Sequence, residues 1–300
     1  MNQPLAPLAP TFDLQSHSTH SDGELAPRDV VRAAAAAGVE LFALTDHDTV
    51  GGIGEAAEAA AEEGLTLVPA IELSICDAAA PDIHILGYGI DHRDGDLLGA
   101  LDRFRADRTG RAGRMIDRLR SSGLELDTST IERRQAEGLP IGRPHLAEAV
   151  LAHEGNAGRL ADERIATVSD LIRGYLIDGK PGFASRETPT AAEAIDVIHA
   201  AGGVAVWAHP FWDISDPTAV TQTLDRYCGL GLDGVEVFYV THDETQTRLL
   251  HDAATARGLL CTGSSDFHGP DHPLFARLRA FDLHELAPRL GPMAAQPASP

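Results

Sequence analysis

Short apolar runs recur along the chain, and most are followed by a segment whose apolar residues have helical spacing. Seven runs have the length and composition of buried strands, at residues 12–14, 40–44, 66–71, 83–88, 204–208, 235–239 and 259–262. Helical patterns lie near residues 28–37, 52–63, 191–201, 217–230 and 243–257. Pro27 introduces the first helix, and Gly64 and Gly258 follow the second and the fifth. Alternating strands and helices predict an α/β fold with a mainly parallel sheet, open or closed.

Residues 101–190 lack this alternation and predict a helical insertion after the fourth strand. The flanking segments, 12–100 and 191–285, then form two parts of one sheet domain, with flexible tails at 1–11 and 290–300. Charge follows the same division. The whole chain has 24 Lys plus Arg against 45 Asp plus Glu, a net charge of −21, whereas residues 101–190 hold 15 basic and 14 acidic side chains. The insertion is therefore nearly neutral inside an acidic protein.

Composition excludes several classes of protein. The net charge of −21 argues against a surface that coats long duplex DNA or binds an anionic membrane. We find no run of about 20 apolar residues and no basic, apolar leader in the first 25 residues, so we expect a cytoplasmic protein. The three cysteines, Cys76, Cys228 and Cys261, lack C-x-x-C spacing and indicate neither a disulfide framework nor a thiolate zinc site.

Histidines and carboxylates gather where the predicted strands end. At least five strands carry such a residue, and the sites of parallel sheets and barrels lie at the carboxyl ends of the strands. Each residue alone has an ordinary explanation, such as a packed histidine or a helix cap, but their recurrence at one end of the sheet favours a shared site. The candidates are His17, Asp22, His47, Glu72, His84, His209, Asp266 and His268.

Imidazole and carboxylate ligands without thiolates are typical of a catalytic site for Zn²⁺, Mn²⁺ or Fe²⁺. Eight candidates exceed the needs of one ion, so we expect two or three divalent ions that share a bridging carboxylate, for which we choose Glu72. Such a cluster serves phosphoester cleavage, because it provides hydroxide at neutral pH and neutralises charge on the phosphate oxygens.

Four sequence blocks resemble the polymerase and histidinol phosphatase (PHP) domain superfamily. They are Asp13-Leu-Gln-Ser-His17-Ser with Ser21-Asp22-Gly23, Thr45-Asp46-His47-Asp48-Thr49, Ala208-His209-Pro210, and Gly263-Ser-Ser-Asp266-Phe-His268. Glu72 and His84 lie between them, and the resemblance extends over most of residues 12–270. It implies a distorted seven-stranded (β/α) barrel with a trinuclear metal site. Within the superfamily, Gly142-Arg143-Pro144-His145 resembles the inserted domain of small bacterial phosphoesterases that act on nucleotides.

The resemblance also implies how the ligands divide among the ions. Asp22, His47 and His268 would hold one ion, and Glu72, His84 and His209 another. A third would be held by His17, Glu72 and Asp266, with Gln15 if its amide coordinates. The family usually has His-x-His after the first strand, and Gln15 replaces the first histidine. Since an amide oxygen is a weaker and harder ligand than imidazole, this ion would be loosely held or would favour Mn²⁺ or Mg²⁺.

Three other groups of residues have two interpretations each. Arg143 offers a planar fork for a phosphate group, assisted by His145, or it pairs with Glu148 one helical turn later. The arginine-rich helix near residues 103–120 faces either solvent or a phosphate. Asp46 and Asp48 could accept hydrogen bonds from ligating imidazoles or from waters, and Asp48 could instead cap the following helix, which we favour.

The leading hypothesis is a metal-dependent phosphatase that removes a phosphate from a nucleotide, such as a 3′,5′-bisphosphonucleotide, by attack of metal-bound hydroxide. Catalysis would depend on Glu72, His209 and Asp266, and substrate binding on Arg143 and His145. The alternative is a 5′-to-3′ exonuclease on short RNA oligonucleotides. Hydrolysis of a C–N bond, as in amidohydrolases, and a metal-occupied binding module are further alternatives. The sequence does not indicate the oligomeric state.

Overall fold

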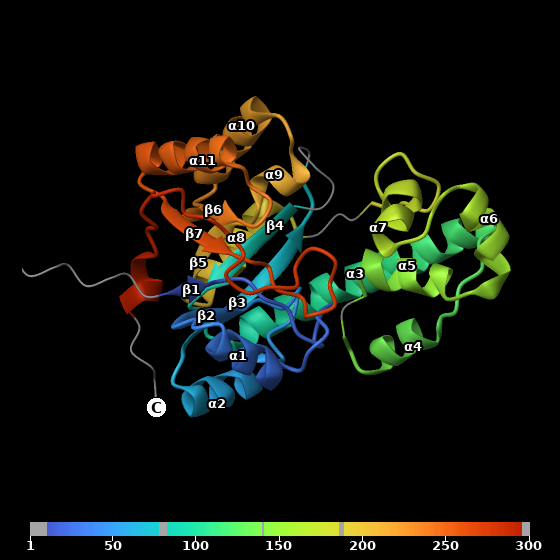
Figure 1. Cartoon of the computed structure of the whole chain (residues 1–300), viewed down its shortest axis with the longest axis horizontal. Helices are drawn as coiled ribbons and strands as arrows, with labels where there is room; N and C mark the ends of the chain where they lie inside the picture. Colours follow the sequence, from blue (N-terminus) through green and yellow to red (C-terminus); the bar gives the residue numbers. More distant parts are fainter. Residues whose placement is uncertain (1–10, 78–82, 140, 186–188, 296–300) are drawn as a thin grey trace, which may run out of the picture.

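The computed structural model describes residues 11–77, 83–139, 141–185 and 189–295. Within them, seven strands form one sheet in chain order: β1 (Phe12–Asp13), β2 (Leu41–Leu44), β3 (Thr66–Ile75), β4 (Ile83–Tyr88), β5 (Val204–Trp207), β6 (Gly234–Tyr239) and β7 (Leu260–Ser264). The edges meet where the Leu14 amide donates to the Gly263 carbonyl at 3.3 Å and Ser16 bridges to Phe267. The sheet is a nearly closed, distorted barrel, and all seven strand predictions are confirmed (Figure 1).

β4 departs from the expected parallel sheet. It pairs antiparallel with both β3 and β5, while the other pairs of neighbouring strands are parallel. The reversal places the start of β4 beside the carboxyl end of β3, so that His84 pairs with Ser74. A histidine near the start of a strand therefore lies at the same end of the barrel as residues at the ends of the other strands.

The helices of the barrel lie where the sequence predicts them: α1 (Pro27–Ala36), α2 (Ile53–Glu63), α8 (Ala191–Ala200), α10 (Pro217–Cys228) and α11 (Glu244–Arg257). Pro27 is the first residue of α1, and Gly64 and Gly258 end α2 and α11 with positive φ angles of 75° and 72°. A four-residue helix, α9 (Pro210–Asp213), follows β5 directly.

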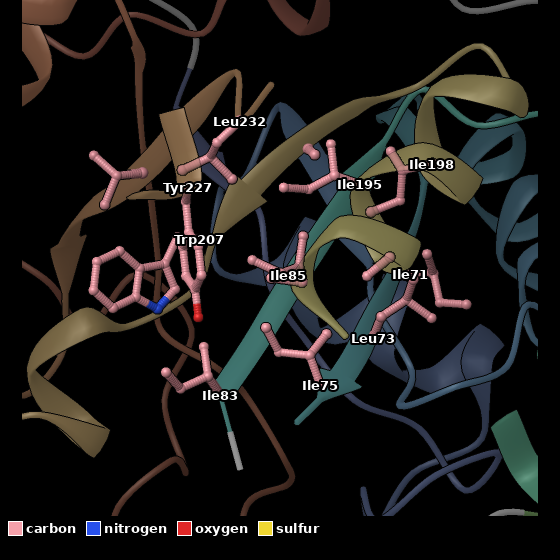
Figure 2. Close-up of a cluster of buried hydrophobic side chains, with 14 of the residues drawn as sticks. Ile71, Leu73, Ile75, Ile83, Ile85, Ile195, Ile198, Trp207, Tyr227 and Leu232 are labelled. Atoms are coloured by element: carbon pink, nitrogen blue, oxygen red, sulfur yellow. The ribbon is translucent and has the colours of Figure 1, made fainter. Parts of the chain in front are cut away.

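Alternating residues of the strands divide between two sides of the sheet. Leu41 and Ala43 pack with residues of the other strands in the barrel interior, whereas Phe42 and Leu44 pack against α1 and α2. On another side, strand residues pack against α8 and α10 around the buried Trp207 (Figure 2). This cluster includes Ile71, Leu73, Ile75, Ile83, Ile85, Ile195, Ile198, Tyr227 and Leu232.

The insertion has its own apolar core and stands beside the barrel (Figure 1). It consists of α4 (Ser129–Ala136), α5 (Arg143–Leu151), a 3₁₀ turn (Glu154–Asn156), α6 (Ala157–Asp162), α7 (Val168–Leu171) and a π-helical turn (Ile172–Leu176). The long helix α3 (Gly95–Ser121) joins the two cores. Leu101 and Phe104 of α3 pack in the barrel cluster, and Met115 and Leu119 pack in the insertion.

The chain end packs where the sequence predicts a flexible tail. Leu290 and Met293 are buried in the interior cluster of the barrel, and Gly291–Ala295 forms a 3₁₀ turn. The expected tail therefore does not begin at residue 290. The remainder, residues 1–10 and 296–300, lies outside the described residues. In the described part of the chain, no helix is long and apolar enough to cross a membrane.

Candidate metal centre and active site

The nine residues predicted as metal ligands converge at one end of the barrel. His17 follows β1, His47 follows β2, and His209 follows β5. Glu72 lies within β3, which runs four residues further than the sequence predicts, and the reversed β4 brings His84 beside it. The remaining members of the group, each within 4 Å of another member, are Gln15, Asp22, Asp266 and His268.

Glu72 occupies the centre and is fully buried. Its Oε1 atom lies 2.7 Å from Nδ1 of His84 and 3.2 Å from Nε2 of His209, and these two nitrogens are 3.3 Å apart. Ligands bonded to one tetrahedral ion at about 2.1 Å are about 3.4 Å from one another. The three atoms therefore have nearly the mutual spacing of ligands that share an ion.

The other oxygen of Glu72 faces a second group. Its Oε2 atom lies 3.1 Å from Nε2 of His17 and 3.7 Å from Nδ1 of His47. Nε2 of His17 is also 3.0 Å from Oδ1 of Asp266. One carboxylate thus contacts histidines on both sides, which is the arrangement expected of the bridging ligand.

A third group surrounds Asp22. Its carboxylate lies 3.6 Å from Nδ1 of His17, 3.7 Å from Nε2 of His47 and 3.6 Å from Nε2 of His268. The His268 ring is fixed by its own backbone, since Nδ1 lies 2.7 Å from the Asp266 carbonyl. The grouping agrees with the ligand set implied by the resemblance and adds His17 to it.

Divalent ions fit these residues. Among the described residues, five buried atoms of the cluster make no hydrogen bond, although ring nitrogens and carboxylate oxygens normally find partners when buried. They are His17 Nε2, Asp22 Oδ1, His47 Nδ1, His209 Nδ1 and Asp266 Oδ1. Three sets of ligand atoms are each close enough to hold one ion: His17, Asp22, His47 and His268; His47, Glu72 and His84; and His17, Glu72 and Asp266.

Gln15 lies in the cluster with its amide nitrogen toward Glu72. The nitrogen donates to Glu72 Oε2 at 2.9 Å, and the amide oxygen lies 3.3 Å from the Ser264 hydroxyl oxygen. An amide nitrogen does not bind a divalent cation, so Gln15 would coordinate only if its amide turned over. In this orientation it restrains the bridging carboxylate.

The charged groups of the cluster and their burial shift one another's pKa values. Burial alone would raise the pKa of Glu72, but the neighbouring imidazoles of His47, His84, His17 and His209 hold that pKa well below its usual range. Burial opposes the charged form of His209, yet the neighbouring carboxylate of Glu72 raises its pKa to about 9. Burial lowers the pKa of His47 to about 4. The site therefore keeps anionic oxygens beside imidazoles at neutral pH.

A second ring of hydrogen bonds holds the ligand loops. Asp46 accepts from the Ser18 amide and hydroxyl, both at 2.7 Å, and from the Ser21 hydroxyl at 2.6 Å. It thereby fixes the loop that carries His17 and Asp22, rather than bonding to an imidazole. The Tyr239 hydroxyl donates to Asp266 Oδ2 at 2.8 Å, which leaves Oδ1 directed at the cluster.

Asp48 does not cap the following helix, contrary to our expectation. Helix α2 begins after Gly52 and has no side-chain cap. Asp48 is fully buried, accepts from the Ser74 amide at 3.0 Å and forms an ion pair with Arg108 of α3. Its φ of 54° is a left-handed conformation that Asp and Asn tolerate better than most residues. Asp48 therefore ties the insertion helix to the barrel.

A pocket of about 130 Å³ opens between the cluster and the insertion. Asp22, His47 and His84 line its barrel side. Arg108, Arg111 and Arg143 line the opposite side. The predicted Arg143 thus lines the pocket, and one face of the arginine-rich helix points at it.

Of the two predicted substrate-binding residues, His145 lies behind the pocket lining. It is 8% exposed, and its Nδ1 accepts a hydrogen bond from the Gly142 amide at 3.0 Å. Burial and the nearby Arg134 lower the pKa of His145 to about 4. It supports the start of α5, where Arg143 is the first residue.

Sequence reasoning did not single out Arg108 and Arg111 among the seven arginines of their helix. Their spacing of three residues places both on one face of α3, and Met115, four residues after Arg111, also lines the pocket. Helical periodicity therefore indicates that Arg108 and Arg111 share a face of α3, but the sequence alone does not show which face of the helix lies against the barrel.

Comparisons with known proteins agree with this geometry. The PHP domain family model matches residues 13–137. Over 261 residues the chain is 35% identical to the 3′,5′-nucleoside bisphosphate phosphatase of Chromobacterium violaceum, covering 86% of this chain and 87% of that protein. Over 259 residues it is 32% identical to the 5′-3′ exoribonuclease of Haemophilus influenzae, covering 86% and 90%.

Two solved structures share the whole fold. An amidohydrolase from Chromobacterium violaceum with bound sulfate has a TM-score of 0.76 and 32% identity, covering 89% of this chain and 93% of that one. A protein from Bifidobacterium adolescentis described as a metal-dependent phosphoesterase has a TM-score of 0.74 and 30% identity, covering 90% and 91%. The chain therefore belongs to the PHP-domain family and is a hydrolase of phosphate esters.

Proposed function

We propose that this chain hydrolyses a phosphomonoester of a nucleotide, such as a 3′,5′-bisphosphonucleotide, with two or three divalent ions. The observation that carries the proposal is the pocket in which metal-type ligands face three arginines. A ligand cluster alone would suit many hydrolases, including those that cleave C–N bonds. The arginine side adds a site for a second phosphate, since guanidinium groups match phosphate oxygens in charge and geometry.

Ions of Mn, Zn, Fe or Mg would be held by His17, Asp22, His47, Glu72, His84, His209, Asp266 and His268. When bound, they would supply an activated water at neutral pH and neutralise charge on the phosphate oxygens. Of these residues, Glu72, His209 and Asp266 would carry catalysis. Glu72 contacts both sides of the cluster, His209 lies against Glu72 and His84, and Asp266 lies against His17 and His268.

The remaining residues orient the cluster and the substrate. Glu236 accepts from the His209 amide at 2.9 Å and from the Ser264 hydroxyl at 2.6 Å, so it fixes the loop that carries a candidate ligand. Arg143 would bind the phosphate that is not cleaved, and His145 would hold Arg143 in place through the start of α5. Neither of these two residues needs to touch the reacting phosphorus.

The test compares two substrates under the same metal conditions: a 3′,5′-bisphosphonucleotide and a 5′-phosphorylated RNA oligonucleotide. We expect faster turnover of the bisphosphonucleotide, because the pocket is small and the arginines are confined to one side of it. Negligible release of phosphate from the bisphosphonucleotide would overturn the proposal.

The alternative is a 5′-to-3′ exonuclease on short RNA, which the similarity to the Haemophilus influenzae exoribonuclease favours. The cluster would perform the same chemistry, and α3 would hold the downstream backbone. Release of mononucleotides from the oligonucleotide, without hydrolysis of the bisphosphonucleotide, is the result that supports this alternative.

A further inference from the structure

An exposed tryptophan lies beside the metal centre, on the loop that also carries a candidate ligand. Trp212 is three residues after His209, within α9, and its amide donates to the His209 carbonyl at 2.9 Å. The side chain is 51% exposed, the highest value among the large apolar residues of the described chain. An indole offers a large, rigid aromatic face on which another ring can stack.

Aromatic contacts connect this indole to the cluster. The Trp212 ring lies 5.5 Å from the Phe275 ring, and Phe275 lies 5.3 Å from the ring of His268. Phe275 is buried and stacks on His272 at 5.0 Å, so it supports the indole from behind. The indole is thus connected to the candidate metal ligand His268 through two ring contacts.

The indole also lies away from the arginine pocket. Trp212 follows β5 and its partner Phe275 follows β7, whereas the arginines face Asp22 after β1, His47 after β2 and His84 of β4. Trp212, Phe275 and His272 are absent from the lining of that pocket. A nucleotide has three separate groups to recognise, and the arginines and the ligand cluster account for its two phosphates.

We propose that the exposed ring of Trp212, backed by Phe275, stacks on the nucleobase of the substrate. This inference rests on the proposed function, because it names how the base of that substrate is bound. The base would lie on the β5 and β7 side of the centre while the uncleaved phosphate lies on the insertion side. Every base has an aromatic face, so the platform would favour nucleotides over sugar phosphates without selecting one base strongly.

The kinetic test uses Trp212→Ala and Trp212→Phe. Loss of one stacking contact to a base weakens binding by roughly 10-fold. We therefore expect Trp212→Ala to raise KM for adenosine 3′,5′-bisphosphate about 10-fold with kcat nearly unchanged, and Trp212→Phe to restore most of the affinity. A ribose bisphosphate, which lacks the base, should show the same KM with all three proteins. Leu230→Ala is the matched control, since Leu230 is 39% exposed on the loop between α10 and β6.

Fluorescence gives a second readout that does not depend on turnover. The chain has two tryptophans, and Trp207 is fully buried, so changes in solvent exposure are reported by Trp212. Rapid mixing of the metal-loaded protein with adenosine 3′,5′-bisphosphate should quench the indole emission before product forms, and Trp212→Phe should abolish this phase.

The outcomes separate this inference from the proposed function. If the wild-type protein hydrolyses the bisphosphonucleotide but Trp212→Ala leaves KM and the emission phase unchanged, the stacking role is wrong and the function stands. If the protein does not hydrolyse it, the proposed function fails. Emission that changes with protein concentration but not with nucleotide would assign Trp212 to a contact between copies of the chain and overturn the proposal.

Discussion

Replacing Asp48 by Asn removes one charge from the ion pair that ties the insertion helix to the barrel. Asp48 is fully buried and its partner Arg108 is 12% exposed at the side chain, so water screens the pair poorly. The substitution keeps the size of the side chain, but it places an amide N–H₂ where Oδ2 of Asp48 accepts from Arg108. Asn tolerates the φ of 54°, and its carbonyl oxygen can still accept from the Ser74 amide. What is lost is the compensation for a largely buried guanidinium.

The size of the effect follows from this geometry. Removing one partner of a buried ion pair costs about 3–5 kcal/mol, because the remaining charge stays buried. Arg108 keeps hydrogen bonds to the Ile141 carbonyl at 3.2 Å and the Ser74 hydroxyl at 3.1 Å. We therefore expect Asp48→Asn to lower the free energy of unfolding by about 2–3 kcal/mol, below the full cost of an uncompensated charge.

The measurement is urea unfolding of the metal-free protein, followed by far-ultraviolet circular dichroism. Metal is left out because Asp48 adjoins His47 and ion binding would add its own stabilisation. Asp102→Asn is the matched control, since it makes the same change in an exposed pair with Arg105 and should cost less than about 0.5 kcal/mol. Equal losses of stability in the two variants would refute the assignment of Asp48 as an anchor. A double-mutant cycle with Arg108→Met should give a coupling energy above about 1 kcal/mol.

Three further predictions concern the site. Glu72→Gln should reduce kcat by at least about a thousandfold and lower the metal content measured by mass spectrometry. The reason is that Glu72 contacts both sides of the cluster. A variant with normal metal content and activity would contradict its bridging role. Gln15→His should increase the number of ions retained per chain during dialysis, whereas Gln15→Asn should not; equal retention in all three proteins would show that residue 15 does not limit occupancy. Arg143→Ala should raise KM for the bisphosphonucleotide with a smaller change in kcat, and an unchanged KM would remove Arg143 from substrate binding.

The strands and barrel helices were predictable because local patterns specify them. Apolar runs bounded by polar loops define the strands, and Pro27, Gly64 and Gly258 mark helix ends through their own backbone preferences. The direction of β4 was not specified by its apolar residues, since a run of buried side chains is compatible with either orientation. The informative signal was the short connection from β3, because a parallel crossover needs a dozen or more residues.

The candidate ligands were predictable for a different reason. His17, His47 and Asp266 lie immediately after strands, and the barrel forces such positions together whatever the details of packing. Arg108 and Asp48 depend instead on how α3 docks against the barrel, a tertiary relationship that neither residue's neighbours in the sequence reveal. Trp212 belongs to the same class, because its exposure is a property of the assembled surface.

Helix α3 connects the barrel and the insertion through one continuous helix. Its first half is built into the apolar core of the barrel and its second half into that of the insertion, and Arg108 and Arg111 lie near the junction. A rotation of the insertion about this helix would move Arg143 of α5 relative to the ligands of the cluster. Because α3 is continuous and is packed in both cores, it fixes the distance between the barrel side and the insertion side of the pocket. A break in the chain after α3, within the insertion, would leave this helix and its contacts with the barrel in place.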